Sequence, residues 1–135
     1  MEPEPSERVI DQRRRNRFIE ALEYLAQGDD GVRLQGLTEY LEGFYDFVRH
    51  RRQGGLSPNT AMNAEEWVLA QDITNLMHSA YDEPASDDAA FIATGWPKRI
   101  QPVALQALKI MLERGKFDEE IEEREPSDLA RCRTS

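Results

Sequence analysis

Five large apolar residues between positions 34 and 48 recur at alternating steps of three and four residues. They are Leu34, Leu37, Leu41, Phe44 and Val48. This spacing places all five side chains along one side of an α-helix, whose period is 3.6 residues. About two heptads are too few for a stable coiled coil, so we expect this apolar seam to pack into the core of a helical protein.

Helix start and stop signals predict further helices in the rest of the chain. Ser6 can cap a first helix, and Asn63 with Glu66 forms the pattern of a capping box before another. The predicted helices cover approximately residues 6–27, 34–53, 63–81, 86–95, 102–115 and 118–125. Gly28 to Gly31 is predicted to be a turn, and no segment shows the alternation of a strand.

Two later helices have predicted buried faces of their own. The predicted core positions are Leu69, Ile73, Leu76, Met77, Ala80, Val103, Leu105, Leu108, Met111 and Leu112. The fold class that follows is all-α, a compact bundle of four main helices plus one or two short helices. A chain of 135 residues fits a single domain, 1–135, with a frayed N-terminus (1–5) and a C-terminal tail (126–135).

The central third of the chain carries charge of one sign. No lysine or arginine occurs between Gln53 and Pro97, and the formal net charge of the whole chain is −9. The acids of this stretch are Glu65, Glu66, Asp72, Asp82, Glu83, Asp87 and Asp88. Clustered charge of one sign attracts opposite charge, so a basic partner protein is expected. Trp96, which precedes Pro97, is expected at a surface or groove, where it would anchor that partner with these seven acids.

Signatures of catalysis and of metal binding are missing from the sequence. The two histidines are His50 and His78, and neither follows a glutamate by three residues, as helical di-iron sites require. The one cysteine, Cys132, lies in a polar C-terminal stretch without a rigid partner. No glycine-rich phosphate loop occurs. We therefore expect no catalytic residue, no cofactor and no metal, and predict that the protein is not an enzyme.

Two arginine clusters raise the question of nucleic-acid binding. Four arginines lie within residues 13–17 and three within residues 49–52. Residues 1–27 hold five arginines against six acids, however, so the first cluster creates no basic surface. We expect these arginines to form salt bridges within their helices or with the acidic middle, and nucleic-acid binding is not expected. No apolar run is long enough to cross a membrane, and without an export signal the expected location is the cytoplasm.

Two functions from different classes fit these features. The first is a small acidic protein-binding module that neutralises or regulates a basic partner, such as a bacterial immunity protein or antitoxin. The alternative is a helical adaptor or homo-oligomerising structural protein without catalytic activity, with a homodimer formed through an apolar helix face. The first reading requires the central carboxylates to share a surface that the arginines do not neutralise.

Overall fold

The computed structural model describes residues 5–47, 59–83 and 85–125, and these residues form helices but no strands. The helices are α1 (Glu7–Leu25), α2 (Asp29–Gln35), α3 (Leu37–Phe47), α4 (Ala64–Asp82), α5 (Asp88–Ala93) and α6 (Trp96–Arg114). The predicted all-α bundle of four main helices with two short ones is confirmed. Residues 1–4 and 126–135, the basic segment 49–52 and Val48 lie outside the described residues.

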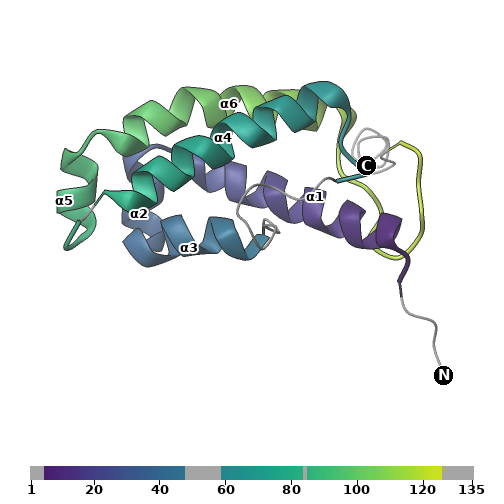
Figure 1. The fold of residues 1–135 in the computed structure, drawn as a ribbon, viewed down its shortest axis with the longest axis horizontal. Helices are drawn as coiled ribbons and strands as arrows, with labels where there is room; N and C mark the ends of the chain where they lie inside the picture. Colours follow the sequence, from purple (N-terminus) through teal and green to yellow (C-terminus); the bar gives the residue numbers. More distant parts are fainter. Residues whose placement is uncertain (1–4, 48–58, 84, 126–135) are drawn as a thin grey trace.

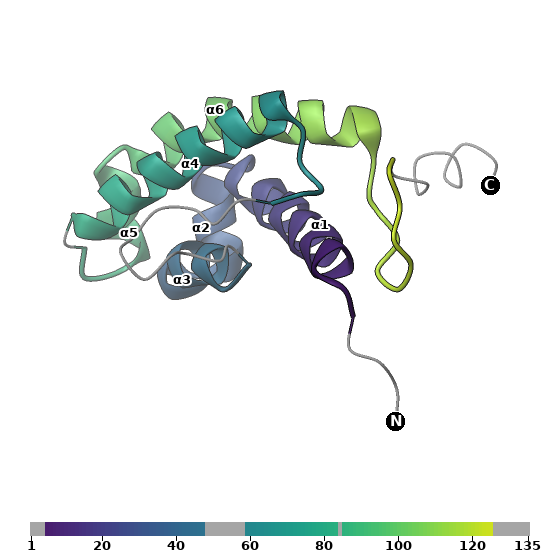
Figure 2. The same ribbon diagram turned by 45° about the vertical axis from the view of Figure 1, so that its right-hand side comes forward.

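The helices are arranged in two layers around one core. Figure 2 shows α4 and α6 lying side by side above α1, α2 and α3, and Figure 1 shows α5 at the end where α4 turns back into α6. The helix α6 packs along both α1 and α4, and α3 packs against α1. Apolar side chains from all six helices meet between the layers. They include Leu22, Val32, Phe44, Ile73, Phe91 and Met111.

The predicted caps start the helices where expected. The Ser6 hydroxyl accepts a hydrogen bond from the Val9 amide at 3.2 Å. Asn63 and Glu66 form the predicted capping box at the start of α4, with the Glu66 amide donating to Asn63 at 2.8 Å. Asp87 caps α5 through the Ala90 amide at 2.8 Å. These side chains satisfy amides that the helix cannot bond internally, so each fixes a helix start from local sequence.

The predicted apolar seam is only partly correct. Gly36 has φ 85° and ends α2, so the predicted long helix is broken and Leu37 starts α3. The residues predicted to form a turn after Gly28 are instead the start of α2. Leu41 and Phe44 are buried and Leu37 is half-buried, but Leu34 is 70% exposed. The break changes the rotation of α2 relative to α3, and Leu34 loses its place on the common face.

The buried face of α6 also differs from the prediction. Leu105 and Leu112 are exposed, whereas Ile100, Ala104, Ala107 and Met111 are buried. Small alanine side chains allow α6 to lie close to both α1 and α4, and the larger leucines then point outward. The helix starts at Trp96 rather than near Pro102, with Pro97 in the first turn, where proline is tolerated.

The predicted acidic helix over residues 118–125 is wrong. These residues have no helical hydrogen bonding and run beside α1. Side chains of α1 bond their backbone instead: Gln12 donates to the Asp118 carbonyl at 2.8 Å, and Asn16 donates to the Phe117 carbonyl at 2.8 Å. Because α1 already satisfies these backbone groups, a helix there would gain little.

Candidate functional site: an acidic helix face and an acidic groove

Three of the seven central acids lie exposed on α4. Glu65 and Asp72 are seven residues apart, which is close to two helical turns, so they share one side of the helix. Asp82 is exposed in the last turn of the same helix. We call Glu65, Asp72 and Asp82 the α4 carboxylates.

Three further acids lie at helix ends, where each accepts a hydrogen bond. Glu83 accepts a hydrogen bond from the indole nitrogen of Trp96. Asp87 caps α5, and a carboxylate oxygen of Asp88 accepts from the Leu37 amide at 2.7 Å. Asp88 thus holds the first turn of α3, where a helix dipole favours negative charge. Glu83 and Asp87 remain exposed, but replacing any of these three would disturb the fold as well as the surface.

The prediction that Glu66 lies on the partner-binding surface is wrong. Its side chain is 0% exposed and accepts hydrogen bonds from Arg15 at 2.8 and 3.2 Å. A second guanidinium, that of Arg114, lies 2.6 Å from the same carboxylate. Glu66 therefore joins α1, α4 and α6 inside the protein and is not available to a partner in this structure. Its capping-box position was visible in the sequence, but its burial was not.

Trp96 is also buried, contrary to its predicted position at a surface. Its exposed fraction is 8%, and it belongs to the apolar core. The guanidinium of Arg99 lies 4.0 Å from the ring centroid on the outer side. Trp96 is the first residue of α6, and the first turn of this helix carries the ring into the core.

The first arginine cluster does not cover the α4 carboxylates. Arg13 donates to the Glu119 carbonyl, and Arg17 pairs with both Glu20 and Glu119. Arg14 lies 3.6 Å from Asp11. Only Arg15 reaches the acidic middle, where it meets the buried Glu66. Within the described part of the chain, no ion pair involves Glu65, Asp72, Asp82, Glu83, Asp87 or Asp88.

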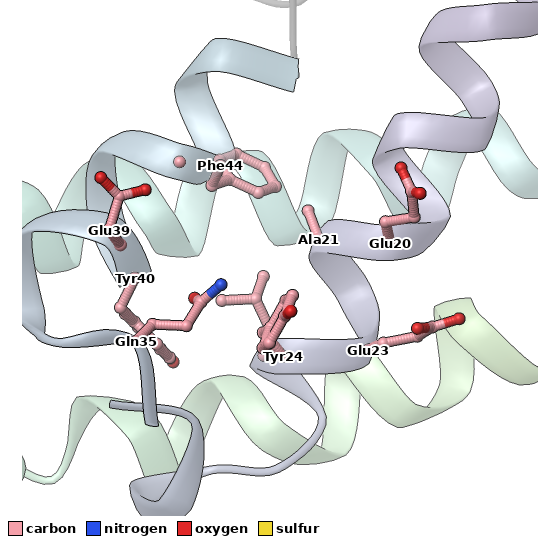
Figure 3. A pocket seen from close by; sticks show the side chains of 10 residues that line it. Glu20, Ala21, Glu23, Tyr24, Gln35, Glu39, Tyr40 and Phe44 are labelled. Atoms are coloured by element: carbon pink, nitrogen blue, oxygen red, sulfur yellow. The ribbon is translucent and has the colours of Figure 1, made fainter. Parts of the chain in front are cut away.

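A groove of about 390 Å³ lies where α1 packs against α3 and is lined by residues of both helices. Figure 3 shows Glu20 and Glu23 on the α1 side and Glu39 on the α3 side, with Tyr24 and Phe44 between them. The remaining lining residues are Ala21, Leu25, Gln35, Tyr40 and Gly43. Sequence reasoning placed Glu39 on a polar helix face but missed the groove, because nothing local indicates that α1 and α3 lie together.

The electrostatics of the groove are dominated by its glutamates. Glu20 is paired with Arg17 at 2.9 Å, whereas Glu23 and Glu39 are exposed and form no ion pair with any described residue. Burial, and secondarily the Asp29 carboxylate, raise the pKa of the Tyr40 phenol, so this side chain stays neutral. An apolar floor with a carboxylate rim can hold a cation whose stem is apolar.

The described residues contain neither a metal-binding cluster nor a helix that could span a membrane. No group of three or more histidine, cysteine, aspartate or glutamate side chains is arranged there to hold a metal ion. Among the helices of the described ranges, none combines the length and apolarity that a membrane span needs. Comparison of the chain with protein-family models, with curated proteins and with solved structures finds no match in any of the three.

Proposed function

We propose that this protein is a small acidic binding module that neutralises or regulates a basic partner protein, in the manner of a bacterial immunity protein or antitoxin. One observation carries the proposal. The α4 carboxylates are exposed and unpaired among the described residues, while the arginines of residues 13–17 bind Asp11, Glu20, Glu66 and residues 111–120. The proposal assigns the protein no catalytic activity.

The physical basis is long-range attraction between opposite charges. The net charge of −9 gives the chain a negative field, and the α4 carboxylates, which form no ion pair with any described residue, concentrate part of it on one helix. Such a surface accelerates encounter with a basic protein and occupies positions where that protein would bind phosphate. Binding should therefore weaken strongly as salt is added.

Two double charge reversals test the proposal. Glu65→Lys with Asp72→Lys changes the α4 face, and Glu7→Lys with Glu122→Lys is the matched control. Each pair replaces one first-turn acid and one further exposed acid. Each substitution adds two charges, so both variants move the net charge from −9 to −5. The ligand to be tested is a basic protein encoded by a neighbouring gene, and its association rate is measured at low and high salt.

We expect the α4 variant to bind about tenfold more slowly at low salt, and the control variant to change much less. Equal rates for the two variants would refute the α4 face as the binding surface. A rate that does not depend on salt would refute electrostatic recognition altogether. Neighbouring genes that encode only metabolic enzymes would also count against the proposal.

The homo-oligomer alternative has one supporting observation. Leu105 is 49% exposed and Leu112 is 40% exposed, and their spacing of seven residues puts both on one side of α6. Leu41, by contrast, is buried, so substituting it would test folding rather than association. Sedimentation of Leu105→Glu with Leu112→Glu separates the alternatives, because only a dimer formed through α6 would dissociate.

A further inference from the structure

The groove between α1 and α3 is a second acidic feature, separate from the α4 face. It combines an apolar floor, provided by Ala21, Tyr24 and Phe44, with carboxylates on both sides. Its volume of about 390 Å³ is large enough to admit one long side chain. Since Glu23 and Glu39 have no cationic partner among the described residues, negative charge at the rim remains available.

Gly43 is the second observation, and it is independent of the charges. It lies inside α3 and lines the groove. Glycine is the least favourable helix residue after proline, so a fold usually keeps it in a helix only for space or for backbone conformation. Among the described residues neither reason is visible: its φ is not positive, and the described atom that an added Cβ would meet is a Glu39 carboxylate oxygen, at an ordinary 3.5 Å.

We propose that the groove between α1 and α3 receives a single arginine side chain of the basic partner protein. Its guanidinium would lie between Glu39 and the Glu20 and Glu23 carboxylates, and its methylene stem would cover the aromatic floor. A planar guanidinium matches this lining because it bonds carboxylates with directed N–H groups and stacks on aromatic rings. Gly43 keeps the α3 wall low beside Glu39, which gives this glycine a role that the described packing does not.

This inference rests on the proposed function for the source of the arginine, but it is tested separately. The probe is the peptide acetyl-Gly-Arg-Gly-amide, titrated into the full-length ¹⁵N-labelled protein and followed by amide chemical shifts. The matched peptide carries citrulline, which keeps the shape of arginine and removes its charge. The variants are Gly43→Ala, Glu39→Gln and, as a control on the α4 face, Asp72→Asn.

The arginine peptide should shift the amides of Ala21 and Gly43 in a saturable manner, and the citrulline peptide should not. Glu39→Gln and Gly43→Ala should each weaken binding by roughly threefold or more, whereas Asp72→Asn should leave it unchanged. Gly43→Ala should also raise the melting temperature, because alanine is the better helix residue. A variant that is more stable yet binds less well is the result that a purely structural role for Gly43 does not produce.

Equal shifts with both peptides, unchanged affinity in Gly43→Ala, or equal weakening by Asp72→Asn would each overturn the groove assignment. Arg49, Arg51 and Arg52 can also be replaced by glutamine. Tighter peptide binding in that variant would mean that this chain's own basic segment occupies the groove, and it would overturn the assignment to a partner's arginine. The two proposals fail differently. Loss of partner binding on reversal of the α4 carboxylates, with no effect of Gly43→Ala on that binding, would retain the proposed function and reject the arginine site.

Discussion

Removing Glu66 should destabilise the protein more than removing Arg15, although the two residues form one ion pair. Both side chains are fully buried, and two hydrogen bonds of 2.8 and 3.2 Å join them. Without Arg15, the Glu66 carboxylate keeps Arg114 at 2.6 Å and the Asn63 amide at 3.1 Å. Without Glu66, the buried Arg15 guanidinium loses its carboxylate partner, and among the described residues Arg114 keeps only the exposed Glu125, at 3.3 Å.

The expected magnitudes follow from that difference. Breaking a buried ion pair from one side costs about 3–5 kcal/mol, so we expect about 4 kcal/mol or more for Glu66→Leu. Arg15→Met should cost about 2–3 kcal/mol, because the carboxylate stays paired while the Met111 and Gly115 carbonyls lose a donor. With a urea m value of about 2 kcal/mol/M, Glu66→Leu should move the unfolding midpoint down by roughly 2 M.

Urea unfolding of the two single variants and the double variant tests this reasoning. The double variant should cost at least about 1 kcal/mol less than the sum of the singles, because apolar residues replace both charges. The matched control is Arg33→Met, which removes an exposed arginine from a surface pair with Asp30 and should change stability by less than about 1 kcal/mol. An additive double variant, or Arg15→Met costing more than Glu66→Leu, would refute the account.

Three further changes test local features of the fold. Tyr40→Phe should raise the free energy of unfolding at neutral pH by about 1 kcal/mol, because the buried hydroxyl has no hydrogen-bond partner among the described residues. Burial raises the pKa of the Tyr40 phenol in the folded chain. The wild type should therefore lose stability as the pH rises above about 10, where the phenol of the unfolded chain ionises. Tyr40→Phe should lose less stability over the same pH range. In thermal unfolding, Gly36→Ala should lower the free energy of unfolding by about 1–3 kcal/mol, and by more than Gly95→Ala does. Both glycines have φ 85° and open space for a Cβ. Only Gly36, at ψ 155°, lies in a backbone region that is nearly restricted to glycine.

The sequence was a good guide wherever the deciding interaction is local. The predicted caps at Ser6 and Asn63 bond amides three residues away, so their pattern fixes helix starts without knowledge of the fold. The stop after α4 at Asp82 was equally visible, since Pro84 follows. The function of the chain stays a proposal, and the sequence contributes to it only the uneven distribution of charge.

Sequence periodicity was a weaker guide where two helix faces have similar hydrophobicity. In α6, alanines at 104 and 107 face the core and leucines at 105 and 112 face outward, because close packing against α1 and α4 selects small side chains. The groove glutamates were missed for a related reason. Glu23 and Glu39 belong to different helices, and only the packing of α1 against α3 brings them to one groove.

By itself, the sequence determined that this chain forms capped helices and that its central third carries only negative formal charge, since both depend on residues close together in the chain. Beyond the local pairs of Arg14 with Asp11 and Arg17 with Glu20, the tertiary structure decided which charges are neutralised. Among neighbouring arginines of similar sequence context, Arg15 became buried because the rotation of α1 turns it toward Glu66 and the end of α6, while Arg13 and Arg17 bond residue 119. Such pairing depends on the relative position of distant helices, which no local pattern encodes.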